Sequence, residues 1–462
     1  MRRAFVVTIG ALLFIGGCAV APKYARPAMP VPPQLPDSAA APAADIAANV
    51  PWQAFVTDVR LRSVIEVVLA NNRDIHIATL NAEKVGAYYR IQRSELYPTV
   101  GAGASIQTTR VPAQLSATAT ADTVTQYSVG LAMTSWELDL FGRIRSLKDQ
   151  ALNQYLAAQQ ITMATHTSLV ATTASTYFAL AADAENRNLA ESTLKAQQHS
   201  LELIQKTRDA GVASDLDVRQ AQSQVEAARA DAARYSGLVE LDRHTLELLA
   251  GSSLPPDLLP ESLSQITPLT AVSAGLSSDV LLGRPDILAA EYQLKAANAN
   301  IGAARAAFFP RISLTGDAGL ASTDLSSLFK AAARTWTFAP QIVTPIFTAG
   351  SLKANLQASQ VGRDIAVAEY EKAIQTAFRE VSDSLTLRRT LVSQRTAEES
   401  LTDALAETYR LSDARYKAGL DSYLGVLVAQ RALIGAQQAL VAVRLAEQQN
   451  LVNLYKVLGG GV

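Results

Sequence analysis

The sequence is poor in cysteine, histidine and net charge, and each shortage excludes a class of protein. Cys18 is the one cysteine among 462 residues, which rules out an internal disulfide and a metal site of several thiolates. The 4 histidines are scattered, with no second histidine or cysteine one helical turn away, which disfavours a metal centre. The 41 Lys and Arg residues balance 42 Asp and Glu residues, so we expect no nucleic-acid partner.

Catalytic constellations and long apolar runs are lacking as well. The sequence offers no Ser-His-Asp or Cys-His arrangement and no phosphate-cradling loop, and Glu137 and Asp139 fit a polar patch better than a catalytic pair. We therefore expect no enzyme and no cofactor. Beyond the N-terminus, no segment has the roughly 18 uncharged apolar residues of a membrane-spanning helix, so any membrane crossing must be made by strands.

The N-terminus has the pattern of a secretory signal. Two arginines precede an apolar stretch that ends at Ile15, and two glycines stand before Cys18. This form resembles the lipobox of bacterial lipoproteins, which implies removal of residues 1–17 and acylation of Cys18. The alternative is an ordinary cleaved signal. Residues 18–58 are rich in Pro and Ala, which predicts an extended, lipid-anchored segment that we call the N-terminal strap.

What the sequence does contain is an internal duplication. The dipeptides Asp74-Ile75 and Tyr97-Pro98 return, at the same spacing, as Asp286-Ile287 and Phe309-Pro310. A second block returns at an offset of 208 residues (418 − 210): Ala210, Gly211, Ser214, Leu216 and Val218 match Ala418, Gly419, Ser422, Leu424 and Val426. The body of the protein is therefore two copies of one unit, residues 59–260 and residues 261–462.

Each unit contains a long stretch without a helix breaker. No Gly or Pro lies between Gly142 and Gly211, and Gly362 is the only one between Ser351 and Ala418. Such a run predicts a helix of about 100 Å at 1.5 Å per residue. A short hinge and a second helix follow, because Gly suits the end of one helix and Ser or Asp the start of the next. We expect one long helical hairpin in each unit, with the hinge at its tip.

Four further segments alternate apolar residues with small or polar ones. They begin near Val100, Tyr127, Ile312 and Trp336 and have the length of outer-membrane barrel strands. The fourth contains Pro340, which would cost a central strand a hydrogen bond. Because four strands cannot close a barrel and open edges are forbidden in lipid, copies must share the barrel, as a dimer or as a trimer. The expected fold class is mainly α with membrane β.

Several segments are familiar as a set. They are Cys18 to Pro27, Ser135 to Arg143, Gly283 to Glu291, Ala306 to Pro310, Thr344 to Gly350 and Arg415 to Leu420. Together they resemble the TolC-like outer-membrane factor family, in its lipoprotein branch, over the whole mature chain. The resemblance implies the outer-membrane channel of a tripartite multidrug or solute efflux pump in a Gram-negative bacterium, lipid-anchored and projecting into the periplasm as a passive exit duct.

The resemblance also implies an assembly. It comprises a homotrimer with a twelve-stranded β-barrel in outer-membrane lipid, a periplasmic α-barrel of duplicated hairpins, a periplasmic adaptor protein and an inner-membrane transporter, commonly of the resistance-nodulation-division (RND) type. The hairpin tips would dock the adaptor, through Gly211, Val212, Ala213, Ser214, Gly419, Leu420 and Ser422. Candidates for the periplasmic gate are Tyr416, Leu424, Val428, Arg431, Asp215, Asp217 and Asp421.

At the gate the sequence departs from the family pattern. Relatives often carry an acidic residue where this chain has Val428, so we expect Leu424 and Val428 to form a hydrophobic plug; alternatively, both are helix-packing residues. The gate aspartates would pair with Arg431 or Arg415. Two other functions stay open: a duct for type I protein secretion or metal-ion efflux, and, in another class, a structural lipoprotein that spaces the envelope.

Overall fold

The computed structural model describes residues 20–36, 50–116, 119–271 and 277–460, so the signal segment and Cys18 lie outside the described residues. The chain divides into two compact units. The first comprises Met1–Ala28, Asn81–Ala158 and Ala289–Tyr370, and the second comprises Met29–Leu80, Gln159–Leu288 and Glu371–Val462. Each unit takes segments from both halves of the sequence, so this spatial division does not follow the duplication.

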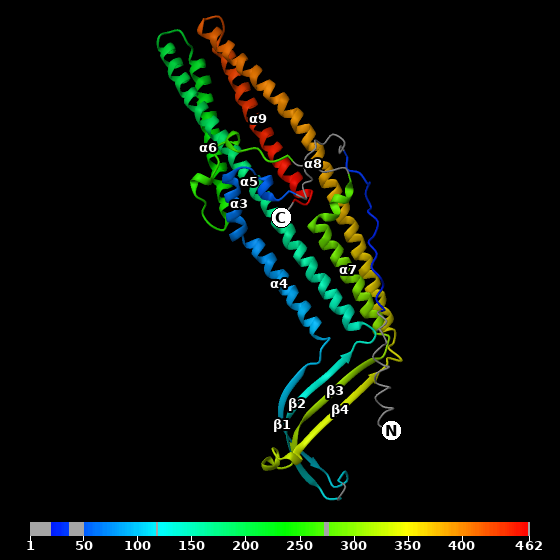
Figure 1. The fold of residues 1–462 in the computed structure, drawn as a ribbon. Helices are drawn as coiled ribbons and strands as arrows, with labels where there is room; N and C mark the ends of the chain where they lie inside the picture. The colour runs from blue at the N-terminus through cyan, green and yellow to red at the C-terminus, as the bar shows by residue number, and fades with distance from the viewer. Residues whose placement is uncertain (1–19, 37–49, 117–118, 272–276, 461–462) are drawn as a thin grey trace. The chain divides into compact units, whose positions relative to one another are not determined.

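Two helical hairpins dominate the structure, as predicted. Helix α5 (Arg143–Asp209) turns into α6 (Asp215–Ala250), and α8 (Ser351–Lys417) turns into α9 (Tyr423–Val457) (Figure 1). Helices α5 and α8 have 67 residues each, so the single Gly362 does not interrupt α8. A lone glycine destabilises a helix by only about 1 kcal/mol, and the stability of the neighbouring helical turns outweighs this loss.

Shorter helices precede each strand pair. In the first half these are α2 (Trp52–Phe55), α3 (Val59–Asn71) and α4 (Arg73–Ser94). In the second half they are η4 (Pro256–Leu258), η5 (Leu263–Gln265), η6 (Ser278–Gly283) and α7 (Pro285–Ala306). Within the second unit, Leu61 and Ile65 of α3 are fully buried, and Phe55 stacks on Tyr455 with ring centroids 4.1 Å apart. Burial of each such side chain stabilises the fold by about 1.5–3 kcal/mol.

The two halves repeat one junction with different residues. At the start of α4, the Asn72 side-chain amide donates to the carbonyl of Leu249 at 2.9 Å. Just before α7, the Arg284 guanidinium donates to the carbonyl of Val457 at 2.7 Å. Both acceptors are orphan carbonyls at the end of a hairpin's second helix, and they are 208 residues apart (457 − 249). The duplication is thus visible in the hydrogen bonding as well as in the sequence.

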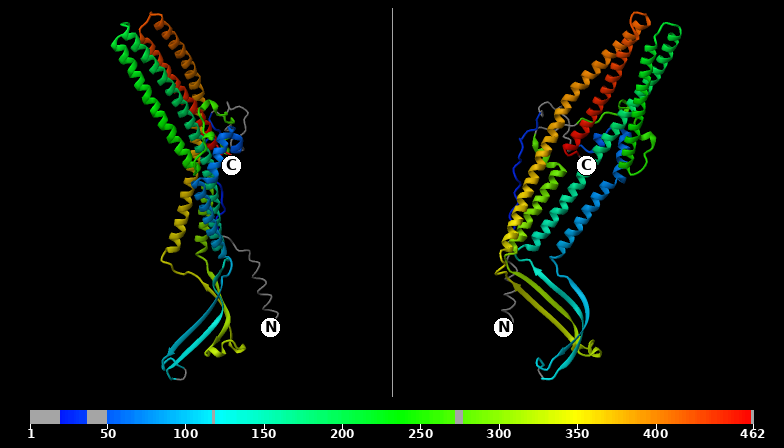
Figure 2. Two further views of the ribbon diagram at one scale, coloured as in Figure 1. Left: turned by 90° about the vertical axis from the view of Figure 1, so that its left-hand side faces the viewer. Right: turned by 180° about the vertical axis from the view of Figure 1, so that it is seen from behind.

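The four predicted strands form one antiparallel sheet in the order β1-β2-β3-β4. They are β1 (Val100–Val111), β2 (Asp122–Leu138), β3 (Arg311–Ser322) and β4 (Arg334–Val343), with the short helices η7 (Leu325–Ser327) and η8 (Ala331–Ala333) between the last two. Pro340 lies in β4, which is an edge strand of the sheet that one chain forms. The views in Figure 2 show that the sheet is strongly twisted and curved.

One helix passes a looser test for a membrane span, although no segment has 18 uncharged apolar residues in a row. Among the described residues, α9 is long and apolar enough to cross a membrane by length and composition, with arginines interrupting its apolar stretch. The core helix of a packed protein passes the same test, and α9 buries residues from Tyr423 to Val457 against the rest of the second unit. Packing accounts for the buried apolar residues of α9, whereas Leu424 and Val428 are exposed.

Candidate functional site at the sheet and the hairpin tips

The strand register sorts the side chains of the sheet onto two different faces. One face is apolar and carries Val100, Ala102, Ile106, Val129, Leu131, Met133, Ile312, Leu314, Leu320, Trp336, Phe338 and Ile342. The opposite face carries Ser105, Gln107, Gln126, Ser128, Ser313, Thr315, Asp317, Thr335, Thr337 and Gln341. Trp336 is 77% exposed and Ile106 is 70% exposed. One exposed apolar face and one polar face are typical of a sheet that forms the wall of a membrane barrel around an aqueous lumen.

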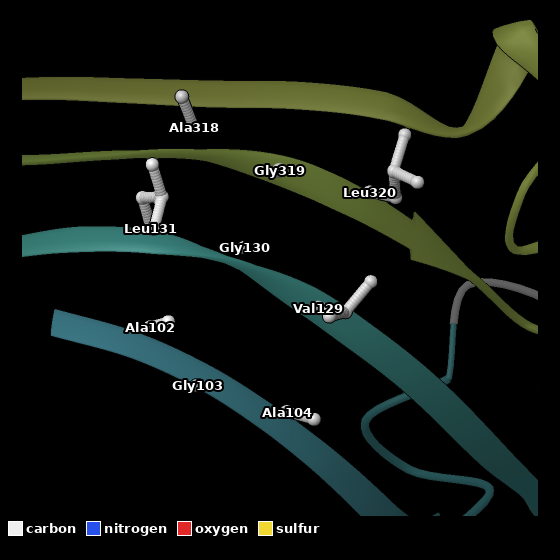
Figure 3. A pocket seen from close by; sticks show the side chains of 9 residues that line it. All are labelled: Ala102, Gly103, Ala104, Val129, Gly130, Leu131, Ala318, Gly319 and Leu320. Carbon is white, nitrogen blue, oxygen red and sulfur yellow. The ribbon is translucent and has the colours of Figure 1, made fainter.

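Three glycines stand in one line across the sheet. Gly103 pairs with Gly130, and Gly130 pairs with Gly319. A Cβ atom on Gly319 would lie 2.3 Å from the Val129 carbonyl oxygen, so β2 and β3 approach too closely there for any side chain. Figure 3 shows the glycines between side chains that stand on one face, such as Val129 and Leu131. Glycines at such positions allow a sheet to bend as a barrel wall requires.

The sheet is incomplete within one chain. In the described residues, β1 and β4 each pair with a strand on one side only. The other side of each presents a row of backbone donors and acceptors, which cannot stay unpaired in lipid. Because β4 and β1 run in opposite directions, β4 of one copy can pair with β1 of another as an antiparallel continuation of the sheet.

Two salt bridges fix the passage from sheet to helix. The Arg143 guanidinium binds Glu137 in bidentate fashion, at 2.9 and 2.8 Å, and Arg145 binds Asp139 at 3.1 Å. Phe141, between them in sequence, stacks on Phe309 with ring centroids 4.8 Å apart. Glu137 and Asp139 therefore form the polar patch that the sequence suggested, with each carboxylate held by an arginine.

Both hairpin tips have the same backbone geometry. Gly211 has φ +79° and Gly419 has φ +72°, the left-handed conformation that favours glycine. The Gly211 and Val212 amides donate to the carbonyls of Arg208 and Thr207, at 2.8 and 2.9 Å. In the second tip, the Gly419 and Leu420 amides donate in the same pattern to Tyr416 and Arg415. Val212 is 83% exposed and Leu420 is 67% exposed, so each tip presents an apolar side chain to solvent.

The charged residues of the tips are mostly paired locally. Asp217 forms a capping box with Ser214, and hydrogen bonds from the Ser214 hydroxyl and amide hold the pKa of Asp217 below its usual range. Asp215 pairs with Arg208 at 3.3 Å. Asp421 binds Arg415, as expected, with one contact of 3.2 Å, and this guanidinium lowers the pKa of Asp421. Among the described residues, none of these aspartates pairs with Arg431.

Tyr416 and the gate candidates of α9 lie on two different surfaces. Tyr416 is partly buried and packs on Tyr423, with ring centroids 5.3 Å apart. Both tyrosines belong to an apolar cluster that joins the two hairpins and also includes Ile204, Ala213, Ala221, Val426 and Leu427. Leu424 is 53% exposed and Val428 is 62% exposed, and Arg431 is exposed on the same stripe of α9. Within one chain, Leu424 and Val428 are therefore more than half exposed.

A clasp between the N-terminal strap and α7 escaped the sequence analysis. Glu291 of α7 is 3% exposed and accepts hydrogen bonds from Tyr24 at 3.0 Å, Arg26 at 2.7 Å and Lys295 at 3.0 Å. Burial alone would raise the pKa of Glu291, but these donors outweigh it and hold the pKa below the usual range. The only sequence signal was an acid inside an apolar helix, four residues before Lys295.

The strap runs antiparallel to α7. The carbonyl of Pro22 accepts from Asn298 at 2.8 Å, and the carbonyl of Val20 accepts from Arg305 at 3.4 Å. Gly302 makes the close approach possible, because a Cβ atom there would lie 2.6 Å from Ala21. The strap thus reaches Arg305, shortly before the start of β3.

Comparison with known proteins identifies this architecture. The family model described as outer membrane efflux protein matches the chain twice, at residues 64–252 and 276–460. The chain belongs to the outer membrane efflux protein family. The two matches have the order and spacing of the duplicated hairpins.

Individual relatives agree with this assignment. The outer membrane efflux protein described here is 48% identical to the probable efflux pump outer membrane protein TtgC of Pseudomonas putida KT2440, over 100% of this chain and 96% of the relative. It is 40% identical to the outer membrane protein OprJ of Pseudomonas aeruginosa, over 97% of this chain and 94% of the relative.

Solved structures show the same fold. The open state of the Neisseria gonorrhoeae MtrE outer membrane channel matches with a TM-score of 0.88 and 36% identity, covering 96% of this chain and 98% of that chain. A membrane protein from Pseudomonas aeruginosa matches with a TM-score of 0.91 and 40% identity, covering 96% and 98%. The predicted fold class, outer-membrane location and function as the outer-membrane channel of an efflux pump are confirmed.

Proposed function

We propose that this outer membrane efflux protein is the passive exit duct of an RND-type pump for drugs or other small solutes, without catalytic activity of its own. The observation that carries this proposal is the combination of a sheet with one apolar and one polar face and two long hairpins with exposed tips. Relatives named as toluene, solvent and antibiotic efflux pump proteins support the substrate class. Energy would come from an inner-membrane transporter through a periplasmic adaptor.

We propose a homotrimer as the working assembly. The unpaired edges of β1 and β4 require at least one further copy, and their opposite directions let copies continue one antiparallel sheet. Three copies would give a barrel of twelve strands, within the range of bacterial outer-membrane barrels. The polar face would line the lumen, and the apolar face would contact outer-membrane lipid.

The chain would be organised as a signal peptide (residues 1–17), the N-terminal strap (residues 18–58) and two repeats (residues 59–260 and 261–462). The strap's course along α7 supports a lipid anchor at Cys18, because Val20, two residues later, is bound by Arg305 near the start of β3. Acyl chains on Cys18 would then enter the lipid beside the sheet.

The tips would dock the adaptor, chiefly through Val212 and Leu420, the exposed apolar side chains next to the tip glycines Gly211 and Gly419. Leu424 and Val428 would narrow the duct as a hydrophobic plug, since both are exposed and lie one helical turn apart. Arg431, Asp215, Asp217 and Asp421 would surround this plug with charge.

Docking at the tips is tested by drug accumulation. A Gram-negative strain without its own outer-membrane factor is given this protein with its cognate adaptor and transporter, and uptake of a fluorescent pump substrate is measured. We expect accumulation to fall on expression and to return with Leu420→Glu, because a charge at the exposed tip would prevent apolar docking. Leu115→Glu, also at an exposed leucine but in the β1–β2 connection, is the control and should leave efflux intact. Unchanged accumulation with a correctly assembled protein would instead favour protein export or metal efflux.

The plug is tested by single-channel recording in planar bilayers. We expect the double substitution of Leu424→Ser and Val428→Ser to raise the conductance of the isolated protein several-fold, because hydrophobic constrictions block ions by excluding water. Leu216→Ser, at the exposed position of α6 that corresponds to Leu424 in the first repeat, is the matched comparison. Conductance equal to that of the native protein would contradict the plug.

A further inference from the structure

The connection between β4 and α8 exposes two large apolar side chains next to each other. Within one chain, Ile346 is 95% exposed and Phe347 is 88% exposed. No residue from Thr344 to Gly350 is charged, so no ion pair of its own holds this connection. Adjacent apolar side chains that stand free in solvent typically mark a surface that another molecule covers.

The connection between β2 and α5 is the equivalent part of the first repeat. Phe141 follows a leucine and precedes Gly142, the last residue before α5. Phe347 follows an isoleucine and comes shortly before Gly350, the last residue before α8. Gly142 has φ +80° and Gly350 has φ +87°, so both long helices begin after a left-handed glycine. Phe347 is therefore the counterpart of Phe141.

The turns before β1 and β3 are equivalent as well. The Tyr97 amide donates to the carbonyl of Ser94 at 3.0 Å, and the Phe309 amide donates to the carbonyl of Ala306 at 3.1 Å. In both turns a proline follows the aromatic residue, and the strand begins shortly after it. Tyr97 is therefore the counterpart of Phe309, and it is 62% exposed.

Within the chain, the first of these connections meets the second of these turns. Phe141 stacks on Phe309, with ring centroids 4.8 Å apart, beside the place where the end of β2 pairs with the start of β3. The counterparts Phe347 and Tyr97 stand at opposite edges of the sheet in one chain. Phe347 follows the end of β4 and Tyr97 precedes the start of β1, and these are the two outer strands (Figure 1).

In a ring of copies joined head to tail, the end of β4 lies beside the start of β1 of the next copy, as the end of β2 lies beside the start of β3 inside one chain. We propose that Ile346 and Phe347 of one copy pack against Tyr97 of the next copy and so close the passage from sheet to helix at each boundary between copies. The contact repeats the stack of Phe141 on Phe309. It presupposes the oligomer proposed above and assigns these side chains to the boundary between its copies.

Chemical cross-linking in the outer membrane tests the contact. Tyr97→Cys and Phe347→Cys are introduced together into the full-length chain, the membranes are treated with a short bifunctional maleimide, and linked copies are counted on a denaturing gel. We expect linked dimers and trimers from the double variant. Either substitution alone should give single chains, which also controls for Cys18.

Two further pairs of cysteines calibrate the cross-linking. Phe141→Cys with Phe309→Cys should link within one chain and leave the mobility of a single chain, because these side chains already stack there. Leu115→Cys with Phe347→Cys should give no linked copies, because Leu115 lies in the β1–β2 connection, at the other end of the sheet.

Dissociation of the assembled protein gives an independent readout. Phe347→Ala should let the oligomer dissociate several-fold faster in warm detergent on semi-native gels, because the apolar contact between copies is lost. Phe329→Ala, at a 77% exposed phenylalanine in the β3–β4 connection, is the matched control and should dissociate like the native protein. Tyr97→Ala together with Phe347→Ala should dissociate no faster than the more affected single variant, since both remove the same contact.

The outcomes separate the contact from the oligomer itself. An assembled oligomer on native gels in which Tyr97→Cys and Phe347→Cys link no copies would overturn the contact and leave the proposed assembly standing. A single chain on native gels would overturn both. Quenching of a fluorophore attached at Phe347→Cys by brominated phospholipid, without cross-linking, would show that membrane lipid covers this connection instead of a second copy.

Discussion

Gly211 and Gly419 show how a single residue type ends two very long helices at equivalent places. Each adopts a left-handed conformation, with φ +79° and φ +72°. Other L residues would pay roughly 1–2 kcal/mol for that conformation, so the glycines fix the turn. The N-cap of the helix that follows differs between the two copies. Ser214, at the start of α6, has Asp217 three residues later and forms a capping box with it. Ser422, at the start of α9, has Gly425 at the same spacing and makes no side-chain cap.

This difference predicts unequal effects of the same substitution. Ser214→Ala should cost the start of α6 about 1 kcal/mol, because the Asp217 amide loses its side-chain acceptor. Amide exchange in the first turn of α6 should then accelerate roughly fivefold. Ser422→Ala should change exchange at the start of α9 little, because Ser422 has no cap bond to lose. Equal acceleration in both variants would show that the capping box contributes nothing.

At the scale of elements, the sheet is shaped by where side chains are missing. The line of Gly103, Gly130 and Gly319 crosses three strands, yet only the last two leave no room for a Cβ atom. The close approach is thus confined to β2 and β3, while a Cβ atom at Gly103 would meet nothing within 4 Å. Strand pairing, and not the glycine itself, decides which position is indispensable.

Alanine substitutions should separate these positions. Gly319→Ala places a methyl group against the Val129 carbonyl and should destabilise the β2–β3 pairing by about 1–3 kcal/mol. We expect a lower yield of assembled protein in the outer membrane and a lower temperature of dissociation on semi-native gels. Gly103→Ala should assemble like the native protein. A normal yield for Gly319→Ala would mean that the strands can separate at no cost.

At the scale of the whole molecule, distant parts of the sequence complete each other's packing. Glu291 is buried on α7 and gains one counter-charge from Lys295 of the same helix and another from Arg26 of the N-terminal strap, 265 residues earlier in the chain. Removing one partner of such a group leaves a buried charge without compensation, which is costly. The strap therefore contributes to the stability of the first unit as well as to any anchoring.

Release of the strap can be measured by limited trypsin digestion. Glu291→Gln should speed cleavage after Lys23 several-fold, because the bidentate bond to Arg26 is replaced by weaker contacts. Arg26→Lys keeps the charge but loses the paired geometry, so an intermediate rate is expected. Cleavage of the Glu291→Gln variant at the native rate would show that other contacts hold the strap.

Local patterns were sufficient to predict most of the fold. Helix length followed from the absence of Gly and Pro between Gly142 and Gly211, and the hinge chemistry located the tips, because both effects act within a few residues. The strands followed from alternation, including the one with Pro340, whose position at a sheet edge the alternation could not reveal. The apolar composition of α9 escaped notice, because single arginines interrupt it.

By itself, the sequence determined the duplication, the hairpins, the four strands and the family, since residue spacing and local residue preferences are enough to predict each of them. Only the tertiary structure decided which charges meet: Glu291 with the strap, and Arg415 with Asp421. The first of these contacts joins segments that lie far apart in the chain, and its partners are set by how whole elements pack. Such a pairing depends on distances between backbones that no local pattern encodes, which is why the contact of Glu291 with the strap became visible only in three dimensions.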